Sequence, residues 1–203
     1  GGDRMIQTEG IFSGGSDIAA PIIGKDFNWT GGDGTYQVLD DGGENWRIKF
    51  LSSGTFTPLR NMVIDAFLVG AGGCKGCTHC GAGGSGYTTT VRSIVLAANT
   101  AYQITIGAAG INPTKAGTDG ADGGTTSAFA ASALGGKGSL AGSSSARKPG
   151  ADGGSGGGGV NISGVHVNSS TAAGGTDGED GATATTAGGT GQGTTTREFG
   201  EAD

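Results

Sequence analysis

Glycine is the residue that most restricts what this sequence can fold into. It supplies 47 of the 203 residues and falls in dense clusters such as "GAGG", "GGKG" and "GGSGGGG". A collagen triple helix needs glycine at every third position without interruption, so that fold is excluded. The order of the glycine-rich half must therefore come from another kind of packing.

The large side chains are distributed unevenly. Ten of the twelve aromatic residues lie at or before Tyr102, and only Phe129 and Phe199 follow. Burying a large apolar side chain stabilises a fold by about 1.5–3 kcal/mol, whereas ordering one residue's backbone costs about 1–2 kcal/mol. Side-chain burial alone cannot order the chain after Ala130, where the large apolar residues are Leu134, Leu140, Val160, Ile162, Val165, Val167 and Phe199.

Main-chain packing is the alternative source of order. Without Cβ atoms, extended helices with three residues per turn can approach closely enough for N–H and C=O groups of neighbours to hydrogen-bond. Close approach also brings Cα–H groups against carbonyl oxygens. We therefore expect polyglycine-II-like helices in "LGGKG", "GGSGGGG", "AGGTDG" and "AGGTGQG", with alternate residues facing water.

The first half of the chain contains the pattern of short β-strands. Residues 46–51 form one predicted strand, followed by a Ser-Ser-Gly turn and a short partner strand. Residues 62–70 are almost continuously apolar, which indicates a strand covered on both faces, and 87–96 and 101–107 alternate. No window shows helical periodicity. The sequence predicts an all-β fold, an antiparallel β-sandwich of jelly-roll type that carries the glycine-rich loops.

Two regions are expected. Residues 1–45 contain apolar side chains such as Phe27 and Trp29 but too few for a core of their own, so they are interpreted as an N-terminal neck, attachment strand or subunit contact. Residues 46–203 form the glycine-rich β-sandwich domain. Because the chain lacks an initiator methionine and stops at "REFGEAD", we interpret it as a processed piece of a longer protein.

Charge and motif content argue against several function classes. A net charge of −6 opposes nucleic-acid binding, and no apolar run approaches the roughly 20 residues that span a bilayer. "GAGGCKG" is followed by strand residues, whereas a phosphate-binding loop requires a following helix. The two histidines, His79 and His166, lie in no recognisable catalytic setting. We expect a protein that is not an enzyme and has no cofactor.

The cysteines form a candidate metal site. Cys74, Cys77, His79 and Cys80 lie within "CKGCTHC", and three thiolates with one imidazole would complete a tetrahedral zinc site. Ligands so close in sequence rarely reach all four corners unless another residue or subunit contributes. A disulfide of Cys77 with Cys74 or Cys80, or free thiols in an exposed loop, are the alternatives.

Acidic residues lie in several glycine turns. Calcium needs six or more oxygen ligands, and calcium-binding repeats also need a regular apolar position, which these turns lack. Solvated turns are therefore the favoured interpretation. The residues concerned are Asp119, Asp122, Asp152, Asp177, Glu179 and Asp180.

The sequence resembles the glycine-rich domains of tail-fibre and other appendage proteins from phages and prophages of Gram-positive bacteria. The resemblance runs from about residue 46 to 201. It implies a non-enzymatic domain of an extracellular virion that attaches to a glycan or protein of the host surface. It is carried by "WRIKFLSSGTFT", "VIDAFLVGAGG", "GGSGYTTTV", "AYQITIGAAG", "GGTTSAF", "ALGGKG" and "TTTREFGE".

By analogy with fibres we expect a homotrimer, with Phe27, Trp29 and the N-terminal region as the subunit contact and other virion proteins bound by the same region. A head-fibre or decoration protein without a receptor is the alternative function, and an ice-binding protein is a more remote one. Host contact is assigned to loop tips within 72–86, 111–123, 142–159 and 172–193. The candidate contact residues are Lys75, Thr78, His79, Asn112, Lys115, Asp119, Asp122, Arg147, Lys148, Asp152, Asp177, Glu179 and Asp180.

Overall fold

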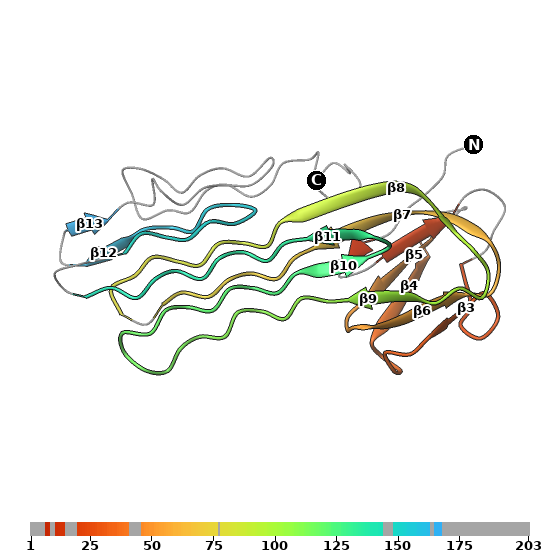
Figure 1. The fold of residues 1–203 in the computed structure, drawn as a ribbon, viewed down its shortest axis with the longest axis horizontal. Coiled ribbons are helices and arrows are strands. Elements are labelled where there is room, and N and C mark those ends of the chain that lie inside the picture. Colours follow the sequence, from red (N-terminus) through yellow and green to blue (C-terminus); the bar gives the residue numbers. More distant parts are fainter. Residues whose placement is uncertain are drawn as a thin grey trace. The chain divides into compact units, whose positions relative to one another are not determined.

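The computed structural model describes residues 7–8, 11–14, 20–40, 46–76, 78–143, 148–162 and 165–167. These residues form β-strands and extended segments without any helix, and none of them forms a helix that could cross a bilayer. The predicted all-β, largely antiparallel fold is confirmed (Figure 1).

The described residues divide into two compact units. The strand unit comprises those within 1–69, 89–106 and 126–132, and the glycine unit those within 70–88, 107–125 and 133–203. The strands, several of which lie close to their predicted positions, are β1 (Gln7–Thr8), β2 (Ile11–Gly14), β3 (Phe27–Trp29), β4 (Tyr36–Asp40), β5 (Trp46–Phe50), β6 (Gly54–Pro58), β7 (Met62–Val69), β8 (Thr88–Leu96), β9 (Tyr102–Thr105), β10 (Thr126–Ala128), β11 (Ala131–Ala133), β12 (Val160–Ile162) and β13 (Val165–Val167).

The strand unit contains three sheets. In one, β7 lies between β1 and β2 and also pairs with β8. The second has the order β11-β10-β9-β6-β3, and the third is the antiparallel pair β4-β5. The hairpin of β10 and β11 closes through Phe129 and Ala130, whose φ angles of 52° and 62° give a two-residue loop of type I′ geometry.

One predicted strand pairing is wrong. Residues 46–51 were predicted to pair with the strand that follows "SSG", but β5 pairs with β4, while β6 lies between β3 and β9. Ser53 is engaged elsewhere, because its Oγ accepts the N–H of Ile106 at 2.9 Å. Gly54 lies opposite Ile104 in the same ladder, so the turn leads the chain into another sheet.

Aromatic side chains build the core of the strand unit. Phe27 packs on Phe56 with ring centroids 5.4 Å apart, and Trp29 packs on Phe50 at 4.3 Å. Trp46 is buried on the same strand as Phe50. This confirms that the first half of the chain supplies the core.

The expected boundary at residue 45 does not separate two bodies, since strands before and after it belong to the same unit. Phe27 has no exposed surface and Trp29 retains only 9%. Their assignment as subunit contacts is therefore wrong. Both side chains find aromatic partners within the chain, which removes their need for a partner subunit.

A buried carboxylate ties β7 to β8. Asp65 lies among apolar residues of β7 and is 5% exposed. Its Oδ1 accepts the N–H of Ser93 at 2.6 Å, and its Oδ2 accepts Arg92 Nη1 at 3.1 Å. Ser93 has a φ of 57°, which interrupts the regular strand and turns its N–H toward the carboxylate.

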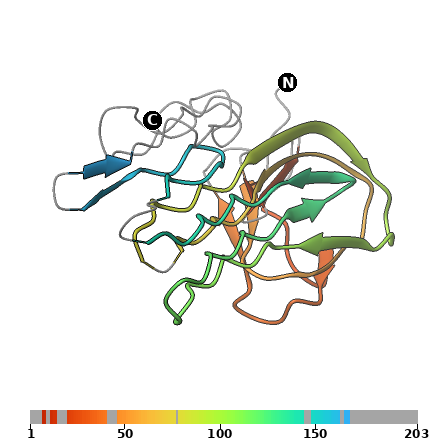
Figure 2. The ribbon, with the colours of Figure 1, turned by 60° about the vertical axis from the view of Figure 1, so that its left-hand side comes forward.

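The glycine unit is a lattice of extended segments joined by main-chain hydrogen bonds (Figures 1 and 2). In segment 70–76, the N–H groups of Gly70 and Gly73 donate to segment 81–87 at 2.8 and 2.9 Å. The N–H groups one residue further on donate instead to segment 120–125, both at 3.0 Å. Successive residues thus bond to different neighbours, and the direction repeats every third residue, as in polyglycine II.

The other segments follow the same rule. Segment 81–87 donates to 134–137 through one set of N–H groups and to 155–158 through the next. Segment 134–142 donates back to 70–76. The donors that repeat at three-residue spacing toward one neighbour are Gly84 and Tyr87; Ala82 and Ser85; Gly120 and Gly123; Gly136, Ser139 and Gly142; and Ala151 and Gly154.

Lattice glycines are needed for the space that a Cβ would occupy. A Cβ on Gly70 would lie closer than 3.0 Å to Leu134 O, and one on Gly84 would lie equally close to Asp152 O. The positive-φ glycines are others, such as Gly117, and lie in turns. These lattice positions require a residue without a side chain. They do not require the conformational freedom of glycine.

The predicted main-chain packing is confirmed for "LGGKG" and "GGSGGGG", with one correction. Outward positions recur at every third residue and do not alternate, because the segments have three residues per turn. "AGGTDG" (173–178) and "AGGTGQG" (187–193) lie outside the described residues.

Candidate functional site

Two loops lie at the same end of the glycine unit. The first follows segment 70–76 and includes residues 78–80, and the second is 111–119. Gly142 and Lys148 lie against the first loop, because Gly142 N donates to Thr78 O at 3.0 Å and Lys148 N donates to His79 O at 3.1 Å.

Two of the cysteines lie in or next to the first loop. The Cys74 thiol donates to Gly110 O, and the Cys80 thiol donates to Gly76 O at 2.6 Å. Both are free thiols, so neither disulfide alternative is formed. Thr78 and His79 have φ angles of 73° and 46°, the left-handed conformation of a tight loop.

The zinc hypothesis stays a prediction. Cys77 lies outside the described residues, and among those described no three potential metal ligands of the His, Cys, Asp or Glu type come together. The Cys74 and Cys80 thiols are directed at two different carbonyl oxygens. His79 Nδ1 is buried without a hydrogen-bond partner.

Two acidic residues join neighbouring glycine segments. Asp119 Oδ1 accepts the N–H of Ala141 at 2.7 Å, and Asp122 Oδ1 accepts that of Gly138 at 2.8 Å. Asp122 Oδ2 also accepts Lys137 Nζ at 2.7 Å. The Lys137 hydrogen bond, then that of Gly138, holds the pKa of Asp122 below its ordinary value, and Asp122 correspondingly raises the pKa of Lys137. The sequence pattern favoured solvated turns for these carboxylates, whereas both accept main-chain N–H groups of the neighbouring segment.

The structure brings together part of the predicted contact set. Lys75, Thr78, Asn112, Lys115 and Asp119 are exposed and lie in or next to the two loops, with His79 and Lys148 partly exposed there. Asp122 and Asp152 are exposed on lattice segments away from the loop tips. The predicted contact residues outside the described part of the chain are Arg147, Asp177, Glu179 and Asp180.

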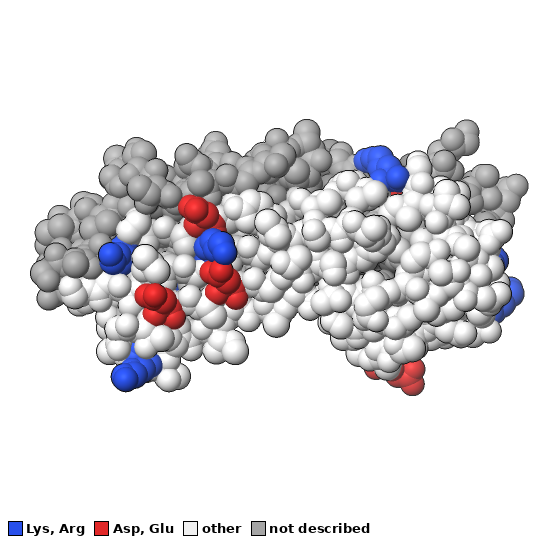
Figure 3. Space-filling model, viewed as in Figure 1, with Lys and Arg blue, Asp and Glu red and all other residues white. Residues whose placement is uncertain are grey.

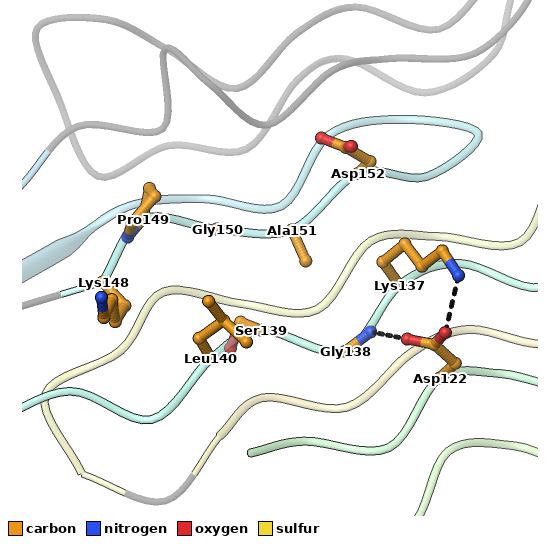
Figure 4. A pocket seen from close by; sticks show the side chains of 10 residues that line it. All are labelled: Asp122, Lys137, Gly138, Ser139, Leu140, Lys148, Pro149, Gly150, Ala151 and Asp152. Atoms are coloured by element: carbon orange, nitrogen blue, oxygen red, sulfur yellow. Dashed lines mark hydrogen bonds and ion pairs between the residues drawn. The ribbon is translucent and has the colours of Figure 1, made fainter.

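A groove of about 370 Å³ lies on the glycine unit between segment 137–140 and segment 148–152 (Figure 4). Asp122 and Lys137 stand at one side, joined by their hydrogen bond, and Lys148 stands at another. Leu140 and Pro149 supply apolar surface. Charges of both signs occur together on this face of the unit (Figure 3).

Leu140, Pro149 and Ala151 were not predicted from the sequence as site residues. Leu140 was noted only as one of few large apolar residues in the second half, and it is 54% exposed. One signal could have identified Leu140 as a site residue. It is a large apolar residue that stays exposed in a segment ordered by its main chain. The lattice determines which segments face each other across the groove. The residue pattern within one segment does not reveal this pairing.

Comparison with protein families shows the family of this chain. A family model described as a glycine-rich domain matches residues 51–202. The chain belongs to this family. The match of the glycine-rich domain begins directly after β5 and includes both loops and both walls of the groove. No curated protein and no solved structure matches the chain.

Proposed function

We propose that this glycine-rich domain is a non-enzymatic part of a virion appendage, a tail fibre, that attaches the particle to the host cell surface through its loop tips. The location would be extracellular, on the phage particle. The sequence resemblance to phage appendage proteins of Gram-positive bacteria supplies this context, and the family match is consistent with it.

The observation that supports the proposal best is that the main chain, and not the loop side chains, orders the glycine unit. Main-chain hydrogen bonds and glycine contacts hold the segments, so loop side chains such as Lys115 and Asn112 are not needed for order. Both residues are exposed. Loops supported by a rigid scaffold can change their side chains without loss of the fold, which suits a surface that must match variable receptors.

Assembly with other virion proteins through the N-terminal region, and trimerisation, remain part of the proposal. The subunit contact must use residues other than Phe27 and Trp29, because both are core residues. Ile22 and Ile23 are 55% and 40% exposed on the same region of the chain. Exposed apolar residues of this kind are suited to a subunit interface.

The proposal is tested by binding the fluorescently labelled chain to a panel of Gram-positive bacterial cells and by competition with phage adsorption. We expect Lys115→Glu, at a loop tip, to lower adsorption by about tenfold. Lys25→Glu makes the same charge change on an exposed residue of the strand unit and should leave adsorption unchanged. If the unmodified chain neither binds cells nor competes with phage across the panel, the attachment role is wrong and a structural head-fibre role replaces it.

A further inference from the structure

The groove between segments 137–140 and 148–152 arises from an interruption of the lattice. Both segments bond to segment 81–87, to which 134–137 runs antiparallel and 151–154 runs parallel, so the two walls run antiparallel to each other. Lys137 N donates to Asp152 O at 2.8 Å, which fixes their register. One turn further along, this register places Leu140 opposite Pro149, and no hydrogen bond joins them. The two segments lie apart there, and the groove occupies the space between them (Figure 4).

The walls offer hydrogen-bond donors and acceptors together. Lys137 uses one of its three N–H groups on Asp122 and is 63% exposed, so two donors remain available. Asp122 retains lone pairs and is 51% exposed. Lys148 Nζ has no ion-pair partner within the described part of the chain. A ligand in the groove would therefore meet ammonium and carboxylate groups within a short span.

The polar groups are held in place before any ligand arrives. Asp122 accepts both Gly138 N and Lys137 Nζ, so its carboxylate is fixed against segment 137–140. The Ser139 hydroxyl points into the glycine unit and donates to Gly81 O at 2.7 Å. This bond fixes segment 137–140 to segment 81–87. Such preorganisation reduces the entropy lost when a ligand binds.

The apolar part of the groove is formed by Leu140, Pro149 and Ala151. Figure 4 shows the Ala151 methyl group directed into the space between the segments. A surface that combines an apolar patch with fixed donors and acceptors matches a sugar ring, which has an apolar C–H face and a rim of hydroxyl groups. Each hydroxyl can donate to a carboxylate and accept from an ammonium group.

Charge and size narrow the class of ligand. Asp122 and Asp152 disfavour an anion such as a phosphate group, and Lys137 and Lys148 disfavour a cation. The volume of about 370 Å³ lies at the lower end of the roughly 300–1,000 Å³ of ligand pockets, which suits a small saccharide. We propose that this groove binds a neutral sugar residue of a cell-surface glycan. The inference rests on the attachment role proposed above and adds to the loop tips a specific contact on the side of the lattice.

The test uses the full chain and an array of neutral hexose and N-acetylhexosamine oligosaccharides, with phosphorylated and sialylated glycans as anionic arms. Ala151→Gln would fill the groove from its wall, and Ala109→Gln adds the same side chain at an exposed position that does not line it. We expect the unmodified chain and Ala109→Gln to bind a neutral glycan, and Ala151→Gln to lower its apparent affinity by about tenfold. Unchanged thermal unfolding of both variants would show that the lattice is intact.

Three results would overturn the saccharide site: no neutral glycan binds, only anionic glycans bind, or both variants bind alike. Cell adsorption then decides separately about the attachment role. If the chain still adsorbs to cells and protease treatment of those cells abolishes adsorption, the attachment role stands with a protein receptor. If binding to neutral glycans depends on Ala151 but cells are not bound, the groove is a saccharide site and the attachment role fails.

Discussion

Asp122 accepts the main-chain N–H of Gly138 on the neighbouring segment, with Oδ1 and N 2.8 Å apart. Three residues earlier, Asp119 accepts the N–H of Ala141 in the same register. The carboxylates thus continue the three-residue repeat of the glycine lattice with side-chain acceptors in place of main-chain carbonyls. This arrangement explains how a polar, aromatic-poor sequence can satisfy its main-chain donors without a conventional core.

Substituting a lattice glycine should destabilise the glycine unit. In Gly84→Ala the new Cβ would lie closer than 3.0 Å to Asp152 O, and we expect a loss of about 1–3 kcal/mol in the free energy of unfolding. Gly72→Ala is the matched control, because its nearest neighbour would be Gly84 O at 3.8 Å. It should be neutral or stabilise by up to about 1 kcal/mol. Urea denaturation measures both, and equal losses would contradict close main-chain packing.

Ser139 occupies a lattice position that glycine holds elsewhere, and its hydroxyl replaces a main-chain interaction. It accepts Gly76 N at 2.9 Å and donates to Gly81 O at 2.7 Å, and the residue is 1% exposed. Ser139→Ala leaves both groups unpaired, so we expect a loss of about 1–3 kcal/mol in unfolding experiments. Ser132→Ala, at an exposed serine, should change stability by less than about 0.5 kcal/mol. A neutral Ser139→Ala would show that these two groups have other partners.

The Asp122–Lys137 pair should make stability depend on pH at both extremes. The pKa of Asp122 is lowered below 3.8, so its contribution is present above that pH and is lost as pH falls through the folded-state pKa. The pKa of Lys137 is raised above 10.5, so its contribution is present below that pH and is lost as pH rises through its folded-state pKa.

Asp122→Asn is the variant that checks this dependence. Because Asp122 is exposed to solvent, the difference from the unmodified chain near neutral pH should be below about 1 kcal/mol. The difference should shrink as pH falls through the folded-state pKa of the carboxyl group. Urea denaturation as a function of pH measures it, with raised salt as a second condition that weakens the ion pair. A difference that is constant from neutral to strongly acid pH would contradict the pairing.

The hairpin turn of the strand unit should be improved by glycine. Ala130 has a φ of 62°, a conformation that costs a residue with a Cβ about 1–2 kcal/mol, although glycine loses more chain entropy on folding. We expect Ala130→Gly to raise stability by up to about 1 kcal/mol in thermal unfolding. Ala131→Gly, in β11, should instead lower it by about 0.5–1 kcal/mol. The reverse order would exclude the left-handed turn.

The sequence was sufficient for predictions that depend on local pattern. The alternation of Trp46, Ile48 and Phe50 identifies β5, and the apolar run through Leu68 identifies β7 as a strand with mostly buried residues. Neither pattern says which strand lies alongside, so the partner of β5 was predicted wrongly. Phe27 looked like an interface residue because its partner Phe56 is brought to it only by the pairing of β3 with β6.

The candidate site shows the same limit. Exposed loop residues such as Lys115 could be selected from composition, since glycine turns lie at surfaces. The roles of Asp122 and Ser139 could not, because each depends on a segment far away in the sequence that lies alongside in the lattice. The groove could be predicted even less well from local pattern, because its walls, segments 137–140 and 148–152, come together through the lattice, where Lys137 N donates to Asp152 O.

The three-residue repeat of hydrogen bonds between segments 70–76 and 81–87 limits how the glycine unit can change in length during evolution. An insertion of one or two residues would rotate every later donor away from its acceptor and bring a side chain into a contact that only glycine permits. An insertion of three, matched in the opposite segment, would preserve all contacts and extend the pair by one turn. Natural variation in the length of these segments should therefore occur in whole turns, while the connecting loops are free to gain or lose single residues.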